Sequence, residues 1–117
     1  MKPKLESAYI AVKNTERAIN FYEWFLERSA NKKGESLYLF DAGGFRLFLF
    51  DHNNENEEVK YGDNCLLSFE VDDARKTKEK IEDRNLKIVF SLTKIQDNLV
   101  FEFEDPEGNH IEVFSKV

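Results

Sequence analysis

The chain repeats one pattern of hydrophobic residues twice, and this repeat constrains its fold more than any other feature. Residues 8–14 alternate between apolar and polar side chains, and a helical pattern of apolar residues follows over 18–26. Residues 67–73 and 74–81 repeat both patterns 59 positions later. Alternation of period two predicts a half-buried strand, and the wider spacing predicts an amphipathic helix. Each copy therefore begins with a strand and continues into a helix.

Each predicted helix has a residue suited to cap its first turn. Asn14 and Asp73 stand between the strand and the helix of the two copies, and both residue types are common N-caps. Helices of about three to four turns are then expected, the usual length in globular proteins. Further strands follow each helix, over 37–41 and 45–50 in the first copy and over 88–92, 99–104 and 110–114 in the second.

The last two strands are joined by a recognisable tight turn. Asp105-Pro106-Glu107-Gly108 suits a type I turn in which the glycine takes positive φ. Beyond the turn, Ile111 and Val113 are predicted to face the core. Because strand side chains alternate, His110 and Glu112 should then share the opposite face. A carboxylate is thus expected to point away from the core.

The length and composition are those of one domain of ordinary size. The chain has 117 residues, of which 41% are hydrophobic and 14% aromatic, enough to bury a core. We expect a single domain over 1–117, with module one at about 5–51, a linker at about 52–63 and module two at about 64–117. The linker prediction rests on the polar run 51–58, which shows no apolar period.

The charge and the absence of targeting patterns exclude several classes of partner. Seventeen basic and 23 acidic residues give a net charge of −6, which repels nucleic acid phosphates. No apolar run predicts a membrane span or a secretory signal, so the expected location is cytoplasmic and no membrane partner is expected. The single cysteine, Cys65, is expected to be structural.

Two motifs within this repeat resemble a known superfamily over nearly the whole chain. Asn20-Phe21-Tyr22-x-x-x-Leu26 and Asp105-Pro106-Glu107-Gly108-Asn109-x-Ile111-Glu112 are similar to the vicinal oxygen chelate superfamily, which includes glyoxalase I, bleomycin resistance proteins and extradiol dioxygenases. The resemblance implies an α+β fold in which duplicated βαβββ modules form one curled mixed sheet. It also implies a homodimer with small-molecule pockets formed between modules.

The resemblance places metal ligands at four strand positions, and this chain departs from it at three. Ser7 and Leu66 stand where the family's metal enzymes have histidine, Phe48 stands near the first module's acidic ligand, and only Glu112 remains. One carboxylate cannot hold a divalent ion tightly. His110 and Glu112 could supply half of a rebuilt site but lack a second half. No metal, cofactor or catalytic residue is therefore predicted.

The expected site is a cup without its metal. By strand parity its lining residues, predicted to bind ligand, would be Ser7, Tyr9, Phe48, Phe50, Leu66, Ser68, Glu70, Glu102, His110 and Glu112. Aromatic rings and carboxylates suit an amphipathic molecule or an organic cation. The leading interpretation is a metal-free protein that sequesters such a ligand. The alternatives are a divergent lyase or dioxygenase with a displaced metal site, and an interaction module that performs neither role.

Overall fold

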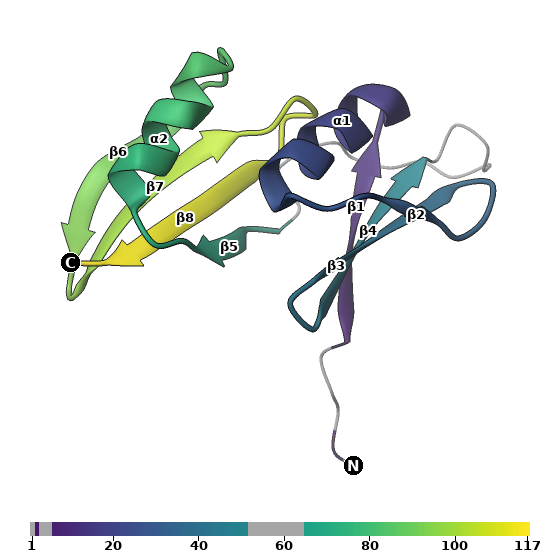
Figure 1. Cartoon of the computed structure of the whole chain (residues 1–117), viewed down its shortest axis with the longest axis horizontal. Helices are drawn as coiled ribbons and strands as arrows, with labels where there is room; N and C mark the ends of the chain where they lie inside the picture. The colour runs from purple at the N-terminus through teal and green to yellow at the C-terminus, as the bar shows by residue number, and fades with distance from the viewer. Residues whose placement is uncertain (1, 3–5, 52–64) are drawn as a thin grey trace. The chain divides into compact units, whose positions relative to one another are not determined.

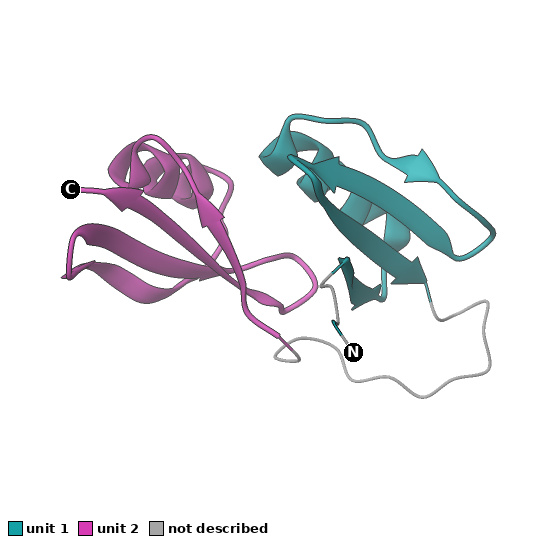
Figure 2. Ribbon diagram, turned by 90° about the horizontal axis from the view of Figure 1, so that it is seen from below, with its two compact units in different colours: residues 1–61 teal, residues 62–117 magenta. Residues whose placement is uncertain are grey.

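The structure consists of two compact units that each contain one copy of the repeat. The computed structural model describes residue 2 and residues 6–51 and 65–117 (Figure 1). The units comprise residues 1–61 and 62–117 (Figure 2). We refer to their described parts as module one (6–51) and module two (65–117). The predicted linker at 52–63 lies outside the described residues.

Each module has one strand, one helix and three further strands in chain order. Module one contains β1 (Ser7–Val12), α1 (Thr15–Leu26), β2 (Asn31–Lys32), β3 (Leu37–Ala42) and β4 (Phe45–Asp51). Module two contains β5 (Leu67–Glu70), α2 (Ala74–Asp83), β6 (Ile88–Ile95), β7 (Asn98–Glu104) and β8 (His110–Lys116). The duplicated βαβββ pattern and the α+β class are therefore confirmed.

The helices begin at the two capping residues that the sequence indicates. The side chain of Asn14 accepts a hydrogen bond from the backbone N of Arg17 at 3.0 Å. Asp73 accepts one from the backbone N of Lys76 at 3.1 Å. These bonds satisfy backbone donors that a helix cannot pair internally. Helix α1 ends at Leu26, and its C-cap residue Glu27 has a left-handed φ of 54°.

The strands of each module pair into a four-stranded mixed sheet. The strand orders are β1-β4-β3-β2 and β5-β8-β7-β6. The pairs β1–β4 and β5–β8 are parallel, and the other neighbours are antiparallel. Where the resemblance implied one curled sheet, the strand pairing of the described residues gives one sheet in each module.

The helix of each module covers one face of its sheet. In module one, Phe40 is fully buried and contacts Tyr22 of α1, with 6.2 Å between the ring centroids. In module two, the hydroxyl of Ser115 accepts a hydrogen bond from the backbone N of Ala74 at 3.0 Å, and Ser115 is buried. The other buried residues of these faces are Ile10, Val12, Leu47, Leu49, Phe101, Phe103, Ile111 and Val113. We call the opposite face of each sheet its open face.

The turn between β7 and β8 forms as predicted. The backbone N of Gly108 donates to the carbonyl of Asp105 at 3.1 Å, and Gly108 has φ 87°. The buried carboxylate of Asp105 accepts bonds from the backbone N of Glu107 and Asn109, both at 2.8 Å, and from the Asn109 side chain at 2.9 Å. This turn fixes where β8 begins, and therefore which of its side chains face α2.

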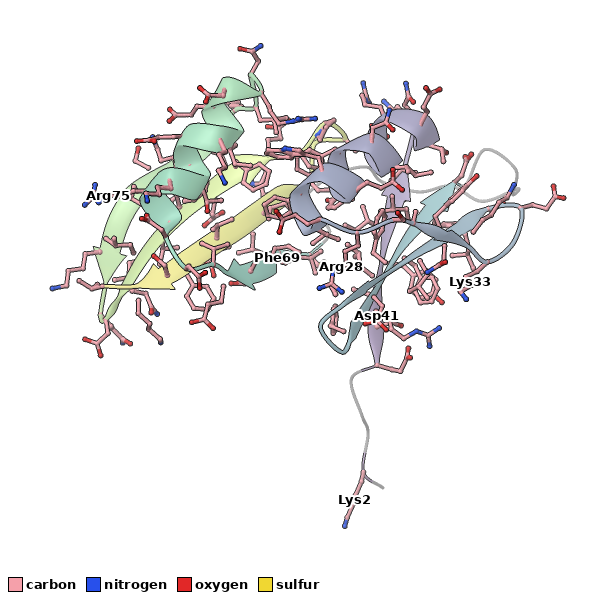
Figure 3. The ribbon with its side chains drawn as sticks, viewed as in Figure 1. Lys2, Arg28, Lys33, Asp41, Phe69 and Arg75 are labelled. Atoms are coloured by element: carbon pink, nitrogen blue, oxygen red, sulfur yellow. The ribbon has the colours of Figure 1, made fainter. Side chains whose placement is uncertain are left out.

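Two strands differ from the sequence prediction. Strand β2 was not predicted, because its two residues are exposed and carry no alternation. It pairs with β3, and Arg28 donates to the carbonyl oxygen of Asp41 in the same region (Figure 3). Strand β6 extends to Ile95 and turns into β7 through Gln96, which has φ 53°. No helix in the described part of the chain is long and apolar enough to cross a membrane.

Candidate ligand-binding faces

The open face of module one carries a stacked pair of aromatic rings. Tyr9 and Phe48 are direct partners in the β1–β4 register. Their ring centroids lie 4.6 Å apart and the ring planes differ by 15°. Tyr9 is 59% exposed, whereas Phe48 is 6% exposed. Phe50, next on this face, is half-buried and pairs with Ala11.

A cation already lies against this aromatic pair. The guanidinium of Arg46 is over the Phe48 ring, 5.2 Å from its centroid. Its Nη1 also forms an ion pair with Glu6 at 2.5 Å, and both of these side chains are substantially exposed. Ser7 is the register partner of Arg46 and is half-buried. Arg46 was missed by the sequence reasoning, because its contact with Phe48 depends on side-chain packing.

The open face of module two carries two glutamates directly opposite each other. Glu112 on β8 is paired with Glu102 on β7 and with Ser68 on β5. The hydroxyl of Ser68 donates to Oε1 of Glu112 at 2.6 Å. Ser68 and Glu112 therefore lie on the same face of the sheet, as strand parity predicts. Glu102 and Glu112 are both half-buried.

The acidic character extends over the rest of this open face. Glu104 is opposite His110, and Glu70 is opposite Phe114. Phe90, on the edge strand β6, is opposite Glu102 and 38% exposed. Within the described residues, no Lys or Arg forms an ion pair with Glu70, Glu102, Glu104 or Glu112. This face thus combines four carboxylates with exposed and half-buried phenyl rings.

The register establishes which positions of the two modules correspond. Tyr9 and Ser68 are related by the 59-residue repeat, and each lies on the strand that pairs in parallel with the last strand of its module. Their partners are Phe48 and Glu112. Phe48 is therefore the position in module one that corresponds to Glu112.

Comparison with known proteins assigns the chain to a family. The family model described as the Glyoxalase/Bleomycin resistance protein/Dioxygenase superfamily matches residues 4–113. The chain belongs to this superfamily. No curated protein matches the chain.

Solved structures of the superfamily fold cover almost the whole chain. An integron cassette protein from the mobile metagenome of V. cholerae is 27% identical with a TM-score of 0.78, over 98% of this chain and 96% of that one. A protein from the mobile metagenome of V. pseudocholerae is 25% identical with a TM-score of 0.80, over 98% and 95%. A lactoylglutathione lyase from Agrobacterium tumefaciens is 20% identical with a TM-score of 0.74, over 97% and 94%. At 20% identity, the similarity to the lyase shows a shared fold alone.

The residues at the superfamily's metal positions do not fit a metal ion. Phe48 and Leu66 carry no donor atom, and Ser7 offers only a neutral hydroxyl, which leaves the carboxylate of Glu112. Tight binding of a divalent ion in a protein takes three or four nitrogen, oxygen or sulfur ligands. Within residues 6–51 and 65–117, no group of three or more His, Cys, Asp or Glu side chains is placed to hold a metal.

The structure divides the predicted site residues between the two open faces. Ser7, Tyr9, Phe48 and Phe50 come from module one; Ser68, Glu70, Glu102, His110 and Glu112 come from module two. Leu66 precedes β5 and is 50% exposed. The sequence reasoning missed Glu104 and Phe90. The alternation through β7 could have identified Glu104, whereas two register shifts in β6 obscure the position of Phe90.

Proposed function

We propose that this superfamily member binds and sequesters a small organic cation on the open face of module two, without metal chemistry. The observation that carries the proposal is the direct cross-strand pairing of Glu102 with Glu112. Like charges placed opposite each other on neighbouring strands destabilise a sheet. A bound cation would relieve this repulsion. Ligand binding therefore accounts for a pairing that would otherwise only destabilise the sheet.

The residues around the pair support an organic cation over a small inorganic one. Phe90 lies opposite Glu102, and Phe114 lies two positions beyond Glu112 on the same face. The faces of aromatic rings attract cations within about 6 Å. They also remove apolar substituents from water, which a bare metal ion does not need. An amphipathic molecule with a positive charge would satisfy both kinds of side chain.

The hydrogen bond to Glu112 supports a role for its ionised form. The Ser68 hydroxyl donates its single hydrogen to Oε1 of Glu112. The other carboxylate oxygen, Oε2, can therefore accept a hydrogen bond from a ligand or lie next to the ligand's positive charge. Charge-assisted hydrogen bonds are stronger than neutral ones. Ser68 thereby orients a carboxylate that can interact with a positively charged group.

The experiment compares two variants that each remove one negative charge. Benzyltrimethylammonium serves as an amphipathic cation, first in a thermal-shift screen and then in calorimetric titration. Glu112→Gln keeps the side-chain shape and should weaken binding roughly ten- to 150-fold, since a hydrogen bond to a charged group is worth roughly 1.5–3 kcal/mol. Glu79→Gln, on the exposed surface of α2, changes the net charge equally and should leave the affinity unchanged.

The outcomes separate binding from catalysis. Equal weakening by Glu112→Gln and Glu79→Gln would show that only the net charge attracts the cation, and would remove the proposed site. One metal ion per purified chain, retained through Glu112, would instead support the divergent enzyme. Both variants must give the same circular dichroism spectrum as the wild-type chain.

A further inference from the structure

The strongest feature outside the acidic face is the aromatic pair on module one. Tyr9 stacks on Phe48 with nearly parallel rings, 15° apart in orientation. Parallel rings at this separation are an arrangement that aromatic pairs favour. Only Tyr9 of the two is exposed, at 59% against 6% for Phe48. One side of the Tyr9 ring is thus covered by protein while much of its surface stays accessible.

The position of Tyr9 in the sheet explains why its ring is accessible. Strand β1 is an edge strand of its sheet, with β4 as its neighbour. Side chains two positions away share the open face with Tyr9, and these are Ser7 and Ala11. Both are small, so neither covers the tyrosine ring from along the strand. A flat group of atoms could therefore reach the ring surface.

The pair is held in place and already accommodates a flat cation. Phe48 is buried, which restricts its ring, and it contacts Tyr9 as well as the Arg46 guanidinium at 5.2 Å. A guanidinium is planar and positively charged, and it stacks readily on aromatic rings. The exposed ring of Tyr9 therefore suits contact with a second flat, positively charged group.

We propose that the exposed ring of Tyr9 is a stacking site for a planar aromatic cation. The electron-rich face of the ring attracts the positive charge, and the flat surface selects a planar molecule over a puckered one. The net charge of −6 favours the approach of a cation over an anion. This inference goes beyond the acidic face of module two and depends only on residues of module one.

The test uses two cations that share a ring skeleton but differ in shape. N-methylquinolinium is planar and aromatic, whereas N,N-dimethyldecahydroquinolinium is saturated and puckered. Both carry a permanent positive charge. Binding to the whole chain is followed by calorimetry and by the proton spectrum of the probe, because stacking on an aromatic ring shifts the probe resonances upfield.

Three variants isolate the ring of Tyr9. Tyr9→Leu removes the ring while keeping an apolar side chain, and Tyr9→Phe keeps the ring without the hydroxyl. Tyr38→Leu is the matched control, because Tyr38 is a tyrosine of the same sheet that pairs with Leu49 and so lies on the helix-covered face. Circular dichroism and thermal melting establish that each variant is folded.

We expect Tyr9→Leu to weaken binding of N-methylquinolinium roughly three- to ten-fold and to abolish its upfield shifts. Tyr9→Phe should retain both, and Tyr38→Leu should change neither. The saturated cation should lose less affinity than N-methylquinolinium on Tyr9→Leu, because it gives up the attraction of its charge to the ring but makes no stacked contact in wild type. Equal N-methylquinolinium affinity in wild type and Tyr9→Leu would overturn the inference, as would an equal loss for both cations. Either result leaves the proposal for module two intact, because that proposal is tested separately through Glu112→Gln.

Discussion

Removing one glutamate of the cross-strand pair should stabilise the protein while impairing its ligand binding. Glu102 has no ion pair within the described residues and is directly opposite Glu112. Directly paired residues have Cβ atoms about 5 Å apart. Two unit charges about 6 Å apart repel by roughly 0.7 kcal/mol at the dielectric constant of water. Glu102→Gln should therefore raise the free energy of unfolding by about that amount.

Thermal and urea unfolding at low salt measure this effect. For a domain of this size the gain corresponds to about 3 °C in melting temperature. The Debye length falls to about 3 Å at 1 M salt, so the difference from wild type should nearly vanish there. Glu79→Gln controls for net charge and should show a smaller gain. A lower stability of Glu102→Gln, or a gain that persists at 1 M salt, would refute the electrostatic reasoning.

Three further predictions concern the turn, the helix contact and the assembly. Asp105→Ala removes the acceptor of three hydrogen bonds. It should lower the free energy of unfolding, measured in urea, by about 3 kcal/mol, because buried donors lose their partner. A loss under about 1 kcal/mol would contradict this. Ser115→Ala leaves the backbone N of Ala74 without its bond and should cost about 1–2 kcal/mol, whereas the exposed Ser91→Ala should be neutral. We also expect a homodimer, since paired copies would cover open sheet edges; sedimentation showing only a 13.8 kDa species at micromolar concentration would exclude it.

The repeat could be predicted from the sequence because its signals are local. The side chains of Asn14 and Asp73 cap their helices by accepting hydrogen bonds from the backbone N three residues ahead. The start of each helix can therefore be predicted from residues that are close in the sequence. The short strand β2 could not be predicted in this way. Asn31 and Lys32 are exposed and form a strand only through pairing with β3, a contact that the sequence pattern does not record.

The same distinction applies to the candidate site. The outward direction of Glu112 follows from the alternation of β8, and strand parity also places Ser68 on the same face, where its hydroxyl donates to Glu112. The pairing of Glu102 with Glu112 and the packing of Arg46 on Phe48 depend on cross-strand register. Register is set by turns and packing over the whole sheet, so these juxtapositions emerge only in three dimensions.

The measurement that tests the central claim most directly is a calorimetric titration of benzyltrimethylammonium into the wild-type chain before and after chelation. Elemental analysis of the same samples gives the metal content. We predict saturable binding with the same affinity in both samples and far less than one metal ion per chain. Metal near one per chain after dialysis, with binding lost on chelation, would contradict it.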